Sequence, residues 1–252
     1  MKFRFKALGL HLLCSAGVLA VVWGFLYLGW YHWPGWYLDD VLSIIGIMAG
    51  VDLALGPLLT FVVGNPNKSR RELTRDIGVI VAVQIVALVY GSMALWSGRP
   101  LYFTFSADRL ELVRASDLEP SEIALGLKRN PAFAPHWYQP LRWVWARLPD
   151  DAKTANDIVS SAIMGGSDVI DMPQYFKRWQ DGLPDLRKQL KVVDKLTNLS
   201  DKDKQRVKVR MSARGFKPVA PITMIMTGRS APLVAVFDPE SVRIVALIRS
   251  SK

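Results

Sequence analysis

The sequence predicts a membrane protein with three N-terminal transmembrane α-helices followed by one exported α+β domain with an antiparallel sheet. Half of the 252 residues are hydrophobic and the mean hydropathy is +0.17, which is high for a soluble protein. The apolar residues gather in three dense runs, at about 7–31, 41–63 and 77–97. Each run exceeds the roughly 20 residues that a helix needs to cross a hydrocarbon core. We therefore expect a transmembrane region over residues 1–97 and one globular domain over residues 98–252.

The first apolar run follows the basic start MKFRFK, as the apolar core of a cleaved signal peptide would. Its length is too great for such a core, and no small-x-small cleavage site ends it. Cys14 does not indicate lipoprotein processing, because Leu13 stands where a small residue would be expected. We interpret the first run as an uncleaved signal anchor.

Basic residues predict the orientation, because lysine and arginine in short loops are retained on the cytoplasmic side. The loop WYHWPGWYLDD, between the first and second runs, has none, and its tryptophans and tyrosines are typical of a membrane interface. The N-terminus is therefore expected in the cytoplasm and residues 98–252 outside. The basic residues that precede the first run or fill the loop between the second and third are Lys2, Arg4, Lys6, Lys68, Arg70, Arg71 and Arg75.

Charge and cysteine content limit the partners of the exported domain. Most of the net charge of +10 falls in residues 98–252, so this domain can face anionic lipid headgroups or an acidic protein. Its location outside argues against nucleic acid as a partner. Cys14 is the only cysteine of the chain, so the exported domain is expected to have no disulfide.

The exported domain is expected to begin and end with strands. Alternation in LYFTF and LELVRA predicts a first hairpin, and PITMIMT, PLVAVF and SVRIVALI predict the last strands, with a turn at Asp238, Pro239 and Glu240. The middle is predicted to be helical, with one helical pattern over residues 174–196 that Gly182 and Pro184 interrupt. Strands around a helical middle predict one α+β domain.

No catalytic constellation is present in the sequence. The histidines are His11, His32 and His136, and only His136 falls in the exported domain. A catalytic triad or a histidine metal site there would have one imidazole at most. We expect no catalytic residue, no cofactor and no metal, and we predict that the protein is not an enzyme.

Aromatic and basic residues concentrate in PHWYQPLRWVWARLPDD, residues 135–151, which contains Trp137, Arg142, Trp143 and Trp145. Two interpretations stay open. The aromatic side chains either cover the sheet as part of its core or form a contact with a partner or a membrane surface. The second interpretation arises because tryptophan, tyrosine and arginine dominate binding hot spots.

The second apolar run contains an acidic residue, Asp52, five residues before Pro57. Asp52 lies about 16 Å from either end of the run, so it must face protein, water or a partner rather than lipid. Pro57 cannot donate a backbone hydrogen bond, which leaves a carbonyl near Leu53 in need of a polar neighbour. In the third run, Gln84 is the best candidate for that neighbour and Tyr90 is the second.

Helical spacing gives the second run two faces of small residues. One contains Gly46, Gly50 and Ala54, and the other contains Ala49, Asp52, Gly56 and Thr60. Two roles for Asp52 stay open: a structural residue that is protonated or hydrogen-bonded within the bundle, or a residue that helps receive the transmembrane helix of a partner. The predicted intramembrane site comprises Asp52, Gly56, Pro57 and Gln84.

Four segments carry a resemblance to a known family. They are the opening FKALGLHLL, the motif GVDLALGPLLT leading into NPNKSRRELTRD, the segment SAIMGGSDVIDMPQYF, and the closing hairpin LVAVFDPESVRIVAL. Together they resemble the type IV pilin accessory proteins of the TfpX/TfpZ type, over nearly the whole chain. The most specific parts are VDLxLGPLLT and RREL, within residues 51–75.

The resemblance implies an inner-membrane protein of Gram-negative bacteria that helps a type IV pilin subunit to be stably presented and assembled. Residues 98–252 would then lie in the periplasm. The implied partners are the pilin, other pilus assembly proteins and the lipid bilayer, and no catalytic residue is implied. The alternative function is a membrane sensor or signalling subunit with a ligand-binding external domain, against which the short inner segments count.

Overall fold

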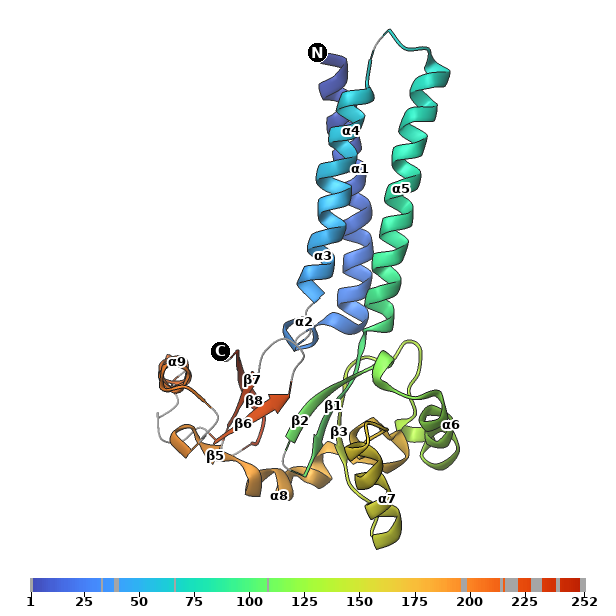
Figure 1. Cartoon of the computed structure of the whole chain (residues 1–252). Coiled ribbons are helices and arrows are strands. Elements are labelled where there is room, and N and C mark those ends of the chain that lie inside the picture. Colours follow the sequence, from blue (N-terminus) through green and yellow to red (C-terminus); the bar gives the residue numbers. More distant parts are fainter. Residues whose placement is uncertain are drawn as a thin grey trace. The chain divides into compact units, whose positions relative to one another are not determined.

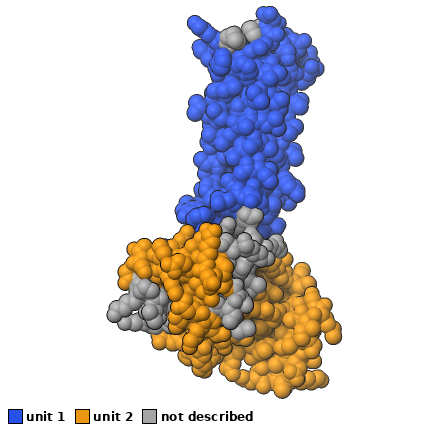
Figure 2. Space-filling model, turned by 60° about the vertical axis from the view of Figure 1, so that its left-hand side comes forward, with its two compact units in different colours: residues 1–99 blue, residues 100–252 orange. Residues whose placement is uncertain are grey.

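A computed structural model of the chain describes residues 2–32, 34–38, 41–65, 67–107, 109–195, 199–213, 215, 222–227, 233–238 and 241–249. The chain divides into two compact units, which Figures 1 and 2 show. The first, Met1–Arg99, is called the bundle, and the second, Pro100–Lys252, is called the sheet domain. Each unit has a buried core of its own.

The bundle contains three helices that are long and apolar enough to cross a membrane, which confirms the prediction of a membrane protein. A short helix, α2 (Gly35–Leu38), lies between the first two spans. The first span consists of α1 (Lys2–Leu26) and the π-helical turn η1 (Tyr27–Tyr31), the second of α3 (Val41–Ala49), the π-helical segment η2 (Gly50–Leu55) and α4 (Gly56–Val63), and the third of α5 (Arg70–Ser97).

Two of the helices begin earlier than the apolar runs that predicted them. Helix α1 begins at Lys2 rather than near residue 7, and α5 begins at Arg70 rather than near residue 77. At α5 the reason is a capping box: Glu72 N–H donates to Ser69 Oγ, and Ser69 N–H donates to the Glu72 carboxylate. Apolar composition indicates where lipid begins, whereas hydrogen-bonded caps decide where a helix begins.

Aromatic side chains hold the end of the bundle that is opposite its N-terminus. The Tyr31 hydroxyl donates to Leu95 O at 2.7 Å, and the rings of Trp30 and Trp96 meet edge to face at 4.8 Å. Trp30, Tyr31 and Leu95 are all buried. Of the predicted interfacial loop, Trp33 and the two aspartates at 39 and 40 lie outside the described residues.

The sheet domain contains one eight-stranded sheet in the order β4-β3-β1-β2-β6-β7-β8, with β5 paired to β6. Most neighbours are antiparallel, but β1 with β3 and β2 with β6 are parallel, so the sheet is mixed rather than purely antiparallel. The α+β class itself is confirmed. The strands are β1 (Pro100–Ser106), β2 (Arg109–Arg114), β3 (Arg142–Ala146), β4 (Phe176–Arg178), β5 (Lys191–Val192), β6 (Ile222–Thr227), β7 (Leu233–Phe237) and β8 (Ile244–Arg249).

The helical middle differs in detail from the predicted pattern over residues 174–196. Helix α8 runs through Gly182 and Pro184 without interruption, ends at Gln189, and is preceded by β4 and followed by β5. The α-helices are α6 (Pro120–Arg129), α7 (Ala152–Ile163), α8 (Trp179–Gln189) and α9 (Asp201–Ser212), and the 3-10 turns are η3 (Ala115–Asp117), η4 (Pro131–Phe133), η5 (Val169–Asp171), η6 (Pro173–Tyr175) and η7 (Val193–Lys195).

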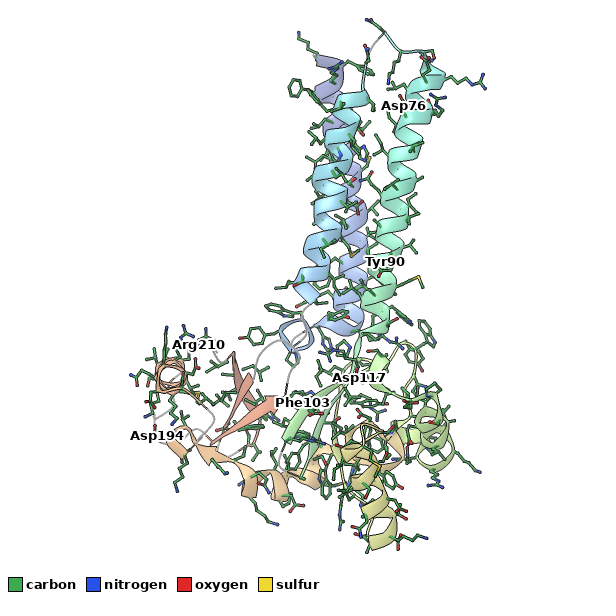
Figure 3. The ribbon with its side chains drawn as sticks, viewed as in Figure 1. Asp76, Tyr90, Phe103, Asp117, Asp194 and Arg210 are labelled. Atoms are coloured by element: carbon green, nitrogen blue, oxygen red, sulfur yellow. The ribbon has the colours of Figure 1, made fainter. Side chains whose placement is uncertain are left out.

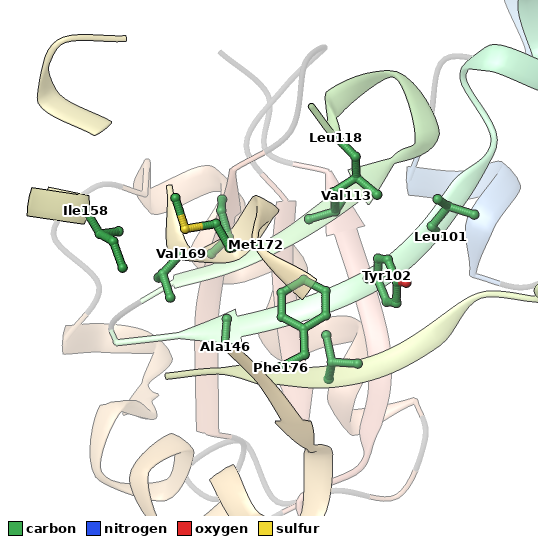
Figure 4. Packing of buried hydrophobic residues seen from close by; sticks show 11 residues of the cluster. Leu101, Tyr102, Val113, Leu118, Ala146, Ile158, Val169, Met172 and Phe176 are labelled. Carbon is green, nitrogen blue, oxygen red and sulfur yellow. The ribbon is translucent and has the colours of Figure 1, made fainter. Parts of the chain in front are cut away.

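The first half of the sheet is covered on both faces. On one face, Tyr102, Ala146 and Phe176 pack with Ile158 of α7 in a buried apolar cluster (Figure 4). On the other face, Phe103 of β1 lies 6.0 Å from Trp179 of α8, measured between ring centroids. The second half uses a separate cluster, in which α9 packs on β7 and β8. Of the predicted last turn, Pro239 and Glu240 lie outside the described residues.

Candidate functional site: a polar cluster inside the bundle

Asp52 lies in η2 and is only 5% exposed. In this π-helical segment the N–H of Gly56 donates to Val51 O, one residue further back than in an α-helix. Pro57 follows and has no N–H to donate. The wider turn therefore leaves the backbone carbonyl of Asp52 free to accept a bond from outside its own helix. Sequence reasoning placed the free carbonyl near Leu53 instead, because it assumed α-helical spacing throughout.

Gln84 of α5 supplies the bond. Its Nε2 donates to Asp52 O at 3.3 Å and to Asp52 Oδ1 at 3.2 Å, so the predicted contact between Asp52 and Gln84 is present. Gly56 makes it possible, since a Cβ atom at residue 56 would lie 2.5 Å from Gln84 Cδ. The second candidate, Tyr90, is 77% exposed on α5 and takes no part (Figure 3).

Two further residues complete the cluster: Thr60, which sequence reasoning placed on the Asp52 face without assigning it a contact, and His11, which it missed. His11 of α1 lies with Nε2 at 2.7 Å from Gln84 Oε1 and with Nδ1 at 2.5 Å from Thr60 Oγ1 of α4. The four residues His11, Asp52, Thr60 and Gln84 are called the polar cluster, and they join all three spans. The missed signal was that the first apolar run, like the other two, contains polar side chains, among them His11.

The directions of the hydrogen bonds of Gln84 follow from the Asp52 carbonyl, which can only accept. Gln84 Nε2 must face it, so Gln84 Oε1 faces His11 and His11 Nε2 carries a proton. His11 Nδ1 then accepts from the hydroxyl of Thr60 in the neutral imidazole. Every donor that His11, Thr60 and Gln84 bring to the polar cluster is therefore used. Within the part of the chain that the structure describes, no residue bonds to Asp52 Oδ2.

A groove of about 350 Å³ opens beside the polar cluster. Its walls come from α1 and α5, and Asp52 and Thr60 form part of its lining from the second span. Helix α4 packs against both α1 and α5, so it closes the back of the groove. Cys14, the single cysteine of the chain, lies on the α1 wall and is exposed.

The other predicted small-residue face of the second span points away from the bundle. Gly46, Gly50 and Ala54 are exposed, and no atom of the described residues outside the local helix backbone lies within 4 Å of the Cβ position of either glycine. Gly56 and Pro57, by contrast, are buried. The structure thus brings Asp52, Gly56, Pro57 and Gln84 together and leaves the first small-residue face open.

The aromatic segment of the sheet domain separates into two parts. Trp143 and Trp145 lie half-buried on one face of β3, where Trp143 meets the rings of Phe103 at 4.3 Å and Trp179 at 5.1 Å. A Cβ atom at Gly182 of α8 would lie 2.5 Å from Trp145 Cγ. These two tryptophans therefore pack between the sheet and α8.

Trp137 and Arg142 have different surroundings. Trp137 is 66% exposed and contacts the ring of its neighbour Tyr138, which is 63% exposed. Arg142 lies with its guanidinium 5.1 Å from the centre of the Phe133 ring. Of the predicted partner surface, only Trp137 is exposed enough to offer most of its ring to another molecule, and the role of all four residues stays a prediction.

A second group of ionisable residues lies in the sheet domain. The pKa of Asp171 is raised to about 7, chiefly by burial and also by the nearby Glu111 and Asp117, against the opposing effect of Arg109. Arg109 also pairs with Asp168. Among the described residues there is no group of three or more His, Cys, Asp or Glu side chains that could hold a metal ion.

The bundle and the sheet domain together define a class: a membrane protein with three spans joined by a hydrogen-bonded polar cluster, followed by an α+β domain. Comparison with known proteins gives the family. The chain is 25% identical over 241 residues to the fimbrial assembly protein of serogroup E1 of Dichelobacter nodosus. The aligned residues cover 94% of this chain and 91% of that protein.

Two further relatives come from the same organism. The fimbrial assembly protein of serogroup I is 27% identical over 213 residues, which are 83% of this chain and 80% of that protein. The protein of serogroups C1 and C2 is 30% identical over 121 residues, which are 48% of this chain and 92% of that protein. The chain belongs to this family of fimbrial assembly proteins. No family model matches the chain, and no solved structure matches it.

Proposed function

We propose that the chain is a non-enzymatic accessory factor of type IV pilus biogenesis, of the TfpX/TfpZ type, that stabilises a pilin subunit and presents it for assembly. The observation that carries the proposal is the similarity over 94% of the chain to a protein named for fimbrial assembly. At that coverage the similarity includes both the bundle and most of the sheet domain, so the role belongs to the whole architecture.

The proposed location is the bacterial inner membrane, with the N-terminus in the cytoplasm and the sheet domain in the periplasm. The basic residues at the N-terminus and in the loop before α5 support this orientation. Lys68 in that loop pairs with Asp76 of α5 at 2.7 Å. A partner with one apolar helix and an external head could then meet the bundle with its helix and the sheet domain with its head.

The proposal includes no catalytic step. His136 is the only histidine of residues 100–252, and it stacks on Tyr138 with ring centroids 6.0 Å apart. His11 is held by its two hydrogen bonds in the polar cluster. Both imidazoles therefore have structural neighbours that account for their positions.

Deletion of the gene tests the proposal. We expect fewer surface fimbriae and a lower level of the fimbrial subunit in the membrane, because the subunit loses the factor that stabilises it. Electron microscopy and immunoblotting of membranes measure the two quantities. Restoring the gene on a plasmid should restore both, and normal fimbriae together with normal subunit level in the deletion strain would refute the proposed function.

A further inference from the structure

The groove beside the polar cluster runs along the helices rather than across them. On α1 its lining recurs at Ala7, His11, Ser15 and Val18, which is the spacing of one helix face. On α5 the lining extends in the same way from Ile77 to Leu88. Each stripe spans about 16 Å of helix at 1.5 Å per residue. The shape is that of a trough between two helices, about three turns long.

Half of the α1 residues that line the groove have small side chains. Ala7, Cys14 and Ser15 all line the groove, and small residues let the backbone of another helix approach closely inside a membrane. A helix is about 10–12 Å across, so a volume of about 350 Å³ receives one ridge of side chains and not a whole helix. This geometry suits a fourth helix that lies against α1 and α5.

The polar residues in the lining of the groove favour an occupant that carries a polar group. Asp52 is 5% exposed and lines the groove, and its Oδ2 has no partner among the described residues, while the donors of the polar cluster are all used within it. Oδ2 needs a donor if Asp52 is ionised and an acceptor if it is protonated. A lipid chain supplies neither, so an occupant that carries a polar group is favoured over lipid.

We propose that the groove between α1 and α5 binds a single transmembrane helix of the fimbrial subunit, and that a polar side chain near the middle of that helix hydrogen-bonds to Asp52 Oδ2. The proposal rests on the proposed function, which supplies the subunit as partner. A second copy of this chain is the weaker occupant, because the one atom of its polar cluster without a partner among the described residues, Asp52 Oδ2, lines its own groove and does not project from an exposed helix ridge. Lipid headgroups are excluded by depth, since Asp52 lies about 16 Å from either end of its span.

Photo-crosslinking in native membranes tests the groove directly. A photoreactive amino acid replaces Val81, which lines the groove, or Val83, which is 57% exposed on the same helix but does not line it. The two positions lie about 200° apart around α5. A third position, Gly50, reports on the exposed small-residue face. The full chain is produced together with the fimbrial subunit, and crosslinked products are identified by immunoblotting and mass spectrometry.

We expect the subunit to crosslink at residue 81 about tenfold more strongly than at residues 83 and 50, which is the equivalent of about 1.4 kcal/mol of preference. Equal yields at the three positions, a maximum at residue 50, or products at residue 81 that contain only lipid or a second copy of the chain would overturn the proposal.

A matched pair of substitutions provides the second measurement. Ser15→Trp fills the groove, whereas Ala16→Trp adds the same side chain at an exposed neighbour outside it. We expect Ser15→Trp to reduce co-purification of the subunit in detergent by about tenfold and Ala16→Trp to leave it unchanged, at equal levels of both variants in the membrane. Equal co-purification with both variants would overturn the proposal. If Ser15→Trp fails to accumulate, the crosslinking result at residue 81 decides.

The outcome is separable from that of the proposed function. If the deletion strain lacks fimbriae but residues 81, 83 and 50 crosslink equally, the groove is not the binding site while the assembly role stands. If the deletion strain has normal fimbriae and normal subunit level, the proposed function fails and the groove proposal fails with it.

Discussion

Gly56 of the bundle and Gly182 of the sheet domain each let a side chain lie directly against the backbone of a helix, but the two side chains differ in kind. Against Gly56 lies the amide of Gln84, which donates to the carbonyl and the carboxylate of Asp52. Against Gly182 lies the indole of Trp145, which packs between β3 and α8. One contact satisfies polar groups, and the other buries apolar surface.

The difference follows from the solvent of each unit. Lipid tails are as apolar as leucine, so burying apolar side chains does little to bring transmembrane helices together, and close packing and hydrogen bonds do more. In water, removal of a large aromatic side chain from solvent is itself a strong driving force. The same residue type thus supports a hydrogen bond in the bundle and an aromatic contact in the sheet domain.

The largest expected effect is that of Gly182→Ala. The new methyl group would lie 2.9 Å from Trp145 Cβ and 2.5 Å from Cγ, atoms that cannot move away without displacing β3. We expect the sheet domain to lose about 2–3 kcal/mol of unfolding free energy, after a gain of about 1 kcal/mol in helix propensity is included. Urea denaturation of the full chain in detergent, followed by tryptophan fluorescence, measures this loss.

Gln180→Ala is the matched control for Gly182→Ala, because Gln180 lies on the same helix and is exposed. Its effect should stay within about 0.5 kcal/mol. Equal stability of the two variants would show that the close approach of Trp145 to α8 does not support the domain.

A smaller effect is expected for Gly56→Ala in the bundle. Here the methyl group meets the end of a flexible side chain, so Gln84 can move, but it then leaves the Asp52 carbonyl without its donor. We expect a loss of about 1–2 kcal/mol, the range of hydrogen bonds between transmembrane helices. The loss is measured as a lower midpoint of thermal unfolding of the purified full chain in detergent, followed by far-UV circular dichroism.

Two controls sharpen the interpretation of Gly56→Ala. Gly50→Ala adds the same methyl group to the same span where no atom lies within 4 Å of it, so it should have little effect. In a chain that already carries Gln84→Ala, Gly56→Ala should also have little effect, because the side chain that it displaces is gone. Additive losses in the double variant would contradict the polar contact as the cause.

The sequence predicted how deep each polar residue lies along its helix, but it predicted only in part which neighbouring helix each side chain faces. Hydropathy gave the three spans, and the need to pair Asp52 gave Gln84. Thr60 was placed on the same face as Asp52, but His11 and its bonds to Thr60 and Gln84 were missed, because a polar residue in an apolar run shows its depth and not the neighbour that it faces. The π-helical segment η2 also shifts the free carbonyl to Asp52, and a change of helical pitch leaves no clear sign in one sequence.

The sheet domain shows the same limit in another form. The hairpin of β1 and β2 follows from local alternation and a short turn, so the sequence predicted it. The parallel pairs of β1 with β3 and of β2 with β6 join segments far apart in the chain, and no local pattern specifies them. Helix α9 was missed as well, although Ser200 caps it by accepting from Asp203 N–H, a signal that its polar, weakly periodic sequence obscured.

The smallest expected effect concerns pH and belongs to the sheet domain alone. The pKa of Asp171 is raised from 3.8 to about 7, chiefly by burial. The folded state therefore binds more protons than the unfolded state between about pH 4 and pH 7, so this group lowers the free energy of unfolding as pH rises through that window. Asp171→Asn removes the group. The unfolding free energy of the variant, relative to that of the parent chain, should therefore rise by on the order of 1 kcal/mol as the pH increases from 4 to 8.

Urea denaturation of both chains at about pH 4, 6 and 8 measures this gain, with Asp157→Asn as the control because Asp157 is exposed on α7. The stability difference between the control and the parent should not change with pH. If the difference between Asp171→Asn and the parent is also constant, the carboxyl group of Asp171 is not buried as the fold requires, and the packing of η5 against β1 and β2 does not exclude water from it.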